Sequence, residues 1–197
     1  AILRVYGSGE PCGFDAEVGR GRAIVIGCAY RCDIDLFRTT LERLGARAHL
    51  THDHEHHGIF MTSTASSDGQ RYIHLLNLDG FDKNLRVYED GVPLFDGREL
   101  LLAAKDAVML PIQVMLDDVS IVYSTAEVLA HSPDGLTFRL TQPSDVIVLE
   151  SSRQVLPDDR YTVTRTGNRS IIQSLQHAKV NDTLTVRLDT KKELNND

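Results

Sequence analysis

Apolar and polar positions follow different periods in the first and second parts of this chain. Before residue 57, a continuous apolar run at 23–27 is followed by four apolar residues that fall on one helical face, namely Leu36, Phe37, Leu41 and Leu44. From residue 58 onward, the apolar residues occur in short runs, several of which alternate with polar residues. The pattern therefore predicts an α/β segment followed by an all-β segment.

The first segment, residues 1–57, is predicted to be a partial Rossmann-like βαβ unit. Residues 23–27 are read as a strand buried on both faces, and 46–50 as its parallel neighbour, with 2–6 beside them. The helix between them starts at Asp33 or Asp35 and ends before Gly45. The glycines at 19 and 21 precede the strand, whereas a dinucleotide fingerprint has its glycines after it. No nucleotide cofactor is expected.

The second segment is predicted to form one or two antiparallel β-sandwich domains. Asp-Gly, a pair that favours tight hairpin turns, occurs at 68–69, 79–80, 90–91, 96–97 and 134–135. Strands are expected between and after these turns, at 59–64, 71–77, 84–89, 99–103, 107–111, 120–123, 136–140, 146–149, 161–165, 170–175 and 184–188. We expect β domains at 58–116 and 117–190, joined near 115–118, and a disordered tail at 191–197. A single continuous structure is the alternative.

Composition narrows the range of partners. The 197 residues are 42% hydrophobic and 25% charged, which is typical of globular proteins. A net charge of −7 without a dense Lys/Arg block argues against a nucleic-acid partner. No apolar run approaches the roughly 20 residues that span a bilayer. Because Ala1 leads directly into a strand-like run with no signal-peptide pattern, we expect a fragment of a larger protein, with the cytoplasm favoured as its compartment.

Clustered histidines and cysteines are the first candidates for chemistry. Seven residues form a polar cluster, namely His49, His52, Asp53, His54, Glu55, His56 and His57. In an extended chain, alternate members point to one side and could bind zinc or copper, but they lie about 6.6 Å apart along a strand. We expect a solvated linker, with a metal-binding domain through His52–His57 as the alternative. The odd set Cys12, Cys28 and Cys32 is a weak zinc signal, and we expect half-buried thiols.

Carboxylates and aromatic residues are the remaining candidates. Glycoside hydrolysis needs two opposed carboxylates in a cleft, and nothing in the sequence pairs Glu127, Asp145 and Glu150. No Gly-x-Ser-x-Gly elbow is present either. A carbohydrate-binding β-sandwich is a second alternative, although the chain has no Trp. Tyr72 and Tyr88 fit strand packing better than a sugar platform.

Short motifs resemble the C-terminal non-catalytic region of bacterial β-galactosidases of glycoside hydrolase families 35 and 42. Residues 19–27 and 35–45 are similar to the end of the Rossmann-like accessory domain that follows the catalytic barrel. Residues 68–77, which end in Leu-Leu-Asn, resemble the β domain after it. Residues 122–128 resemble a family 35 segment that passes into another β domain. The family's catalytic glutamates lie on a barrel that this chain lacks, so none is assigned here.

The resemblance implies a non-catalytic accessory fragment of a β-galactosidase-like glycoside hydrolase. Its expected role is to support the catalytic barrel or oligomer assembly, so the barrel and a homo-oligomer are the expected partners. We expect no catalytic residue, cofactor or metal, and no nucleic-acid or membrane partner. The sugar and its linkage stay open.

Overall fold

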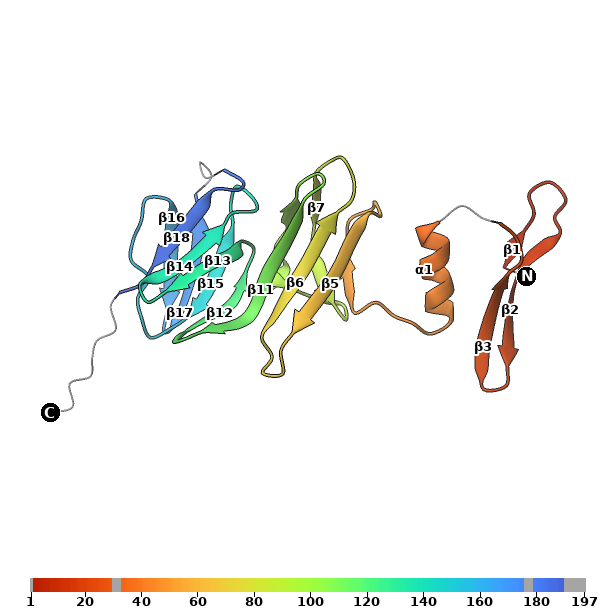
Figure 1. Cartoon of the computed structure of the whole chain (residues 1–197), viewed down its shortest axis with the longest axis horizontal. Helices are drawn as coiled ribbons and strands as arrows, with labels where there is room; N and C mark the ends of the chain where they lie inside the picture. The colour runs from red at the N-terminus through yellow and green to blue at the C-terminus, as the bar shows by residue number, and fades with distance from the viewer. Residues whose placement is uncertain (1, 30–32, 176–178, 190–197) are drawn as a thin grey trace. The chain divides into compact units, whose positions relative to one another are not determined.

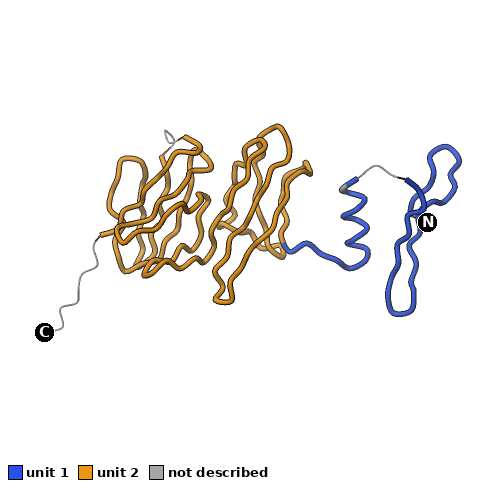
Figure 2. Tube along the Cα trace, in the orientation of Figure 1, with its two compact units in different colours: residues 1–49 blue, residues 50–197 orange. Residues whose placement is uncertain are grey.

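The computed structural model describes residues 2–29, 33–175 and 179–189, so the expected tail at 191–197 lies outside the described residues. The chain divides into two compact units, residues 1–49 and 50–197 (Figure 2). It is 53% strand and 7% helix, and the strand pairs are antiparallel. The fold is therefore almost all β.

Unit 1 combines a small sheet with a helix. Its three-stranded antiparallel sheet has the order β1-β2-β3, with β1 at Leu3–Arg4, β2 at Pro11–Val18 and β3 at Gly21–Ile26. Helix α1, Ile34–Arg43, is the predicted helix. Its first turn is capped by the Asp33 side chain, which accepts a hydrogen bond from the Leu36 N–H at 3.0 Å. Gly45 follows with φ +91°, the left-handed conformation expected at a helix C-terminus.

The Rossmann-like prediction is wrong. Strand β3 pairs antiparallel with β2 and is only half-buried, whereas a central parallel strand would be covered on both faces. The strand after the helix is β4, Leu50–His52, and it pairs antiparallel with β8 of unit 2. The sequence signal that was missed is in residues 14–18, where apolar and acidic residues alternate before Gly19. A strand followed by such a turn forms a local hairpin, which closes a much shorter loop than a βαβ crossover.

Unit 2 is built on a seven-stranded antiparallel sheet of order β16-β17-β15-β12-β11-β6-β5 (Figure 1). The strands of this sheet are β5 Ile59–Ala65, β6 Arg71–Asn77, β11 Ala107–Leu116, β12 Val119–Ser124, β15 Val146–Glu150, β16 Tyr161–Thr166 and β17 Arg169–Ser174. Smaller sheets add β13 Glu127–Ser132, β14 Gly135–Arg139 and β18 Thr183–Arg187; β7 Lys83–Leu85 and β10 Leu100–Leu102; and β4, β8 Val87–Glu89 and β9 Val92–Pro93. A short 3₁₀ turn, η1, spans Phe95–Gly97. The described strands form no closed barrel.

Two hydrophobic cores share the large sheet. Strand β15 is buried on both faces, with Val146 and Val148 in one core and Ile147 and Leu149 in the other. This double burial explains why its sequence is apolar throughout. Gln113 adopts φ +53° within β11, and the pairing of β12 with β15 shifts between Ile121 and Tyr123. Such bulges twist strands, and here they accompany the change from one core to the other.

The expected domain boundary near 115–118 coincides with a hairpin turn. Strands β11 and β12 meet at this turn, where Asp117 has φ +53°, and they are neighbours in the seven-stranded sheet. The sheet therefore includes strands from both sides of residue 117.

The Asp90-Gly91 turn tests the hairpin register. Both residues have positive φ, 48° and 82°, and they join β8 to β9. Replacing Gly91 with valine should lower the free energy of unfolding by more than about 1 kcal/mol, because a β-branched residue is strained at positive φ. Urea unfolding of the variant measures this loss.

Arg86→Thr, at an exposed position before the turn, is the control. Its surface ion pair with Asp53 should contribute less than about 1 kcal/mol. If Gly91→Val unfolds at the same urea concentration as the unchanged chain, a requirement for positive φ at this turn is contradicted.

Candidate functional site

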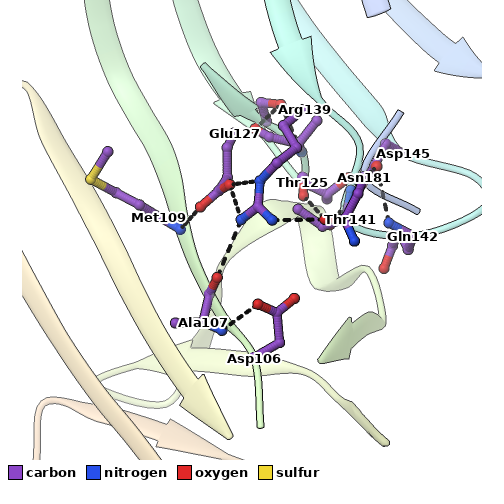
Figure 3. Close-up of polar contacts among 12 residues, drawn as sticks. Asp106, Ala107, Met109, Thr125, Glu127, Arg139, Thr141, Gln142, Asp145 and Asn181 are labelled. Carbon is purple, nitrogen blue, oxygen red and sulfur yellow. Dashed lines mark hydrogen bonds and ion pairs between the residues drawn. The ribbon is translucent and has the colours of Figure 1, made fainter. Parts of the chain in front are cut away.

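Two of the candidate carboxylates, Glu127 and Asp145, form two neighbouring groups of polar contacts around a chain crossover (Figure 3). After β12 the chain leaves the seven-stranded sheet and enters β13 of a second sheet. The connecting residues Ser124, Thr125 and Ala126 are fully buried. The Ser124 hydroxyl donates to the Ala126 carbonyl at 2.7 Å and accepts from the Ala126 N–H at 2.9 Å. The Ser124 side chain thus satisfies backbone groups of the crossover that are buried away from water.

Glu127 is held by a backbone amide and an arginine. Its Oε1 accepts a 2.6 Å hydrogen bond from the Met109 N–H of β11. Its Oε2 accepts from the guanidinium of Arg139, which lies directly opposite on β14. Arg139 also donates to Asn181 Oδ1 at 2.8 Å and to the Ala107 carbonyl at 3.3 Å. The pair therefore joins β11, β13 and β14.

This ion pair satisfies backbone groups of β11 that have no neighbouring strand on one side. Strand β12 pairs with β11 only from Ile112 onward, so residues 107–111 of β11 have no strand neighbour on that side. Glu127 and Arg139 bind the Met109 N–H and the Ala107 carbonyl there. Pro111, which has no N–H to satisfy, lies in the same stretch.

Asp145 is fully buried at the start of β15. Its Oδ1 accepts from the hydroxyls of Thr125 at 2.7 Å and Thr141 at 3.2 Å. Its Oδ2 accepts from the N–H groups of Thr141 at 2.8 Å and Gln142 at 3.2 Å. One carboxylate thus fixes the crossover and the turn before β15 to each other.

Both carboxylates are hydrogen-bonded by protein groups. Burial raises the pKa of Asp145, while hydrogen bonds from Thr125, Gln142 and Thr141 lower it, but the group has no exposed surface. Both oxygens of Glu127 are bound by protein groups. The third candidate, Glu150, is exposed at the end of β15. The hydrogen bonds that Glu127 and Asp145 accept give both side chains a structural role.

The histidine stretch makes local contacts after β4. Asp53 accepts hydrogen bonds from the backbone N–H and the guanidinium of Arg86, at 2.7 and 3.2 Å. His56 packs edge-on against Phe81, with ring centroids 5.5 Å apart. Within the described residues no group of three or more His, Cys, Asp or Glu side chains is arranged to hold a metal ion. Cys32, which together with Cys12 and Cys28 gave the weak zinc signal, lies outside the described residues.

A buried lysine lies beneath this stretch. The Lys83 side chain of β7 is inaccessible to solvent, and its Nζ donates to Asp79 Oδ2 at 2.6 Å and to the His57 carbonyl at 3.1 Å. The contact with Lys83 holds the pKa of the Asp79 carboxyl below its usual range. The lysine therefore links β7 to the chain that enters β5.

His52 makes the stability of this region depend on pH. Burial, together with the nearby charges of His54 and Lys83, lowers the pKa of His52 below its ordinary 6.5. The unfolded chain therefore binds a proton at a pH where the folded chain does not. Above pH 6.5 His52 is neutral in both states and has no unfavourable effect on stability. As the pH falls below 6.5 toward the lower folded-state pKa, the free energy of unfolding should decrease.

Urea midpoints at about pH 7.5 and about pH 5.5 test this dependence. The unchanged chain should lose more stability on acidification than His52→Gln, whose side chain does not titrate. Equal losses in the two proteins would contradict a role for His52.

An open apolar groove lies on strands β5, β6 and β11. Its volume is about 460 Å³, and its apolar lining includes Phe60, Leu76 and Met109. Phe60 is 58% exposed. The Thr64 hydroxyl and His74 Nε2, also in the lining, are hydrogen-bonded to each other at 3.0 Å. Glu127 forms part of the wall, so the groove adjoins the ion pair.

Comparison with known proteins adds no family assignment. Neither protein-family models nor curated proteins gave a match to this sequence. No helix among the described residues is both long and apolar enough to cross a membrane.

Sequence reasoning missed Arg139 and Lys83. Arg139 alternates with apolar residues in residues 136–140, which is the pattern of an exposed strand position. Lys83 follows an Asp-Gly turn, where a charged residue is ordinarily solvated. The structure shows the roles of these two residues through their partners, which are Glu127 for Arg139 and Asp79 for Lys83.

Proposed function

We propose that this chain is a non-catalytic accessory region of a β-galactosidase-like glycoside hydrolase, and that it supports the catalytic barrel. The observation that carries the proposal is the structural use of Glu127 and Asp145, which join strands and a buried crossover and leave no exposed carboxylate pair between them. The β-galactosidase part of the proposal rests on the sequence resemblance.

The places where the resembling motifs fall also support it. Residues 122–128, which resemble a passage between β domains, cover the crossover from β12 to β13. The Leu-Leu-Asn motif at 75–77 ends β6, where the Asn77 side chain donates to the carbonyls of Phe81, Leu102 and Ala103. Both motifs therefore have structural roles, as an accessory region requires.

Expression of the complete open reading frame that contains this chain tests the proposal. The complete product should hydrolyse an aryl β-galactoside. A version that lacks residues 1–197 should lose thermal stability, because the barrel loses its packing partner. A complete product without turnover, or a deletion that changes neither stability nor activity, would contradict the proposal.

A variant within this region separates support from catalysis. Glu127→Gln in the complete product should lower the melting temperature and leave kcat within about twofold, because the residue acts only on strand pairing. A loss of kcat by about a hundredfold with unchanged stability would instead assign Glu127 to the reaction.

A further inference from the structure

Unit 1 has almost no hydrophobic core. Of the residues in 2–29 and 33–49 whose burial is described, only Gly13 is buried. Its larger apolar side chains are exposed, including Val25 at 58% and Phe37 at 59%. Folded units below about 40 residues usually need disulfides, metals or partner subunits, and unit 1 is only slightly larger. Apolar burial among its own residues therefore contributes little to the stability of unit 1.

Two cysteines, Cys12 and Cys28, lie at the open end of the β2–β3 hairpin. The regular pairing of the hairpin runs from the turn at Gly19 to the Gly13–Ile26 pair. One further hydrogen bond, from the Gly27 N–H to the Cys12 carbonyl at 2.7 Å, extends the ladder. Cys12 accepts this last bond and Cys28 directly follows its donor, and both cysteines are free and partly buried.

We propose that Cys12 and Cys28 are an oxidation site, at which a disulfide closes the base of the β2–β3 hairpin. The hairpin register places Gly27 opposite Cys12, so Cys28 is the diagonal neighbour of Cys12 across the two strands. A disulfide needs this closeness of the two backbone segments together with side chains that turn toward each other. Partial exposure of both residues gives a small oxidant access.

The oxidation is a thiol–disulfide exchange with a low-molecular-weight disulfide such as oxidised glutathione. One protein thiolate attacks a sulfur of the small disulfide and releases one small thiol, which leaves a mixed disulfide. The second protein thiolate displaces the other small thiol, so a protein S–S bond forms and the small disulfide is reduced. Partial burial, then the neighbouring Cys28, raise the pKa of Cys12, so exchange should accelerate with rising pH.

The cross-link should stabilise the hairpin strongly. It would close a loop from residue 12 to residue 28, similar in length to the roughly 15-residue loops for which disulfides have a substantial effect on the unfolded chain. Amide hydrogen exchange within β2 and β3 should therefore slow by about tenfold or more on oxidation, while exchange in unit 2 stays unchanged.

Peptide mapping of the full chain tests the assignment, because trypsin places each cysteine in a different fragment: 5–20, 23–31 and 32–38. The chain is incubated with oxidised glutathione, alkylated and digested without reduction. The expected product is fragment 5–20 joined to 23–31, with Cys32 alkylated. The Cys32→Ser variant should give the same product.

Cys12→Ser and Cys28→Ser provide the matched controls. Each should abolish the 5–20 to 23–31 product and the slower exchange of β2 and β3. Alkylation of all three cysteines after oxidation, or a predominant link to the fragment 32–38, would overturn the proposal. So would a Cys12–Cys28 link that leaves exchange in the hairpin unchanged.

Discussion

Replacing Asp145 with alanine is expected to lower the free energy of unfolding of unit 2 by about 3 kcal/mol or more. The side chain is fully buried and accepts hydrogen bonds from two hydroxyls and two backbone N–H groups. The hydroxyls of Thr125 and Thr141 can turn to other acceptors, since Thr141 also donates to the Thr125 carbonyl. The N–H groups of Thr141 and Gln142 cannot turn, and each buried donor without a partner costs about 1–3 kcal/mol.

Asp145→Asn is the matched control. Its one carbonyl oxygen can still accept from the two N–H groups, and its amide can donate to the hydroxyls, so the loss should be about 1 kcal/mol. Urea unfolding followed by near-UV circular dichroism reports on unit 2, where Tyr123 and Tyr161 are buried. Equal losses for the alanine and asparagine variants would show that the four hydrogen bonds do not determine the stability of this turn.

Gly135→Ala should be comparably damaging, by about 3 kcal/mol, because the added carbon has no space. Gly135 begins β14 opposite Arg187 of β18, and a Cβ there would lie 2.2 Å from the Val186 carbonyl oxygen. A backbone atom in a paired strand cannot move aside as a flexible side chain can. The substitution must therefore separate β14 from β18, which together cover the core that contains Phe138 and Val186.

Gly80→Ala is the control for Gly135. No atom lies within 4 Å of the position that its Cβ would occupy, and its φ is not in the left-handed region. Its unfolding free energy should change by less than about 0.5 kcal/mol. If Gly135→Ala were equally harmless, the close approach of β14 to β18 would be wrong.

The hairpins of unit 2 could be predicted because their signals are local. Residues 71–77 and 146–149 show their strands in the spacing of apolar residues, and Asp90-Gly91 shows its turn in the need for positive φ. The arrangement of the sheets could not be predicted in the same way. Strand β12 pairs with β11 and β15 and then crosses to another sheet, and that choice depends on contacts distant in sequence.

In unit 1 the local pattern itself was misinterpreted. The apolar run at 23–27 fits a buried parallel strand and a hairpin strand equally well, because periodicity alone does not report the neighbour. The alternation in β2 was the deciding signal.

At the candidate site, Glu127 and Asp145 could be named from the sequence, but not their partners Arg139 and Thr125, which lie 12 and 20 residues away.

The most direct test of a non-catalytic role is an aryl β-galactoside assay of the purified chain by itself. If Glu127 and Asp145 serve only to hold strands together, the chain should show no turnover above a buffer control. Turnover that persists through repeated purification, and that disappears in the folded Glu127→Gln or Asp145→Asn variant, would contradict the account.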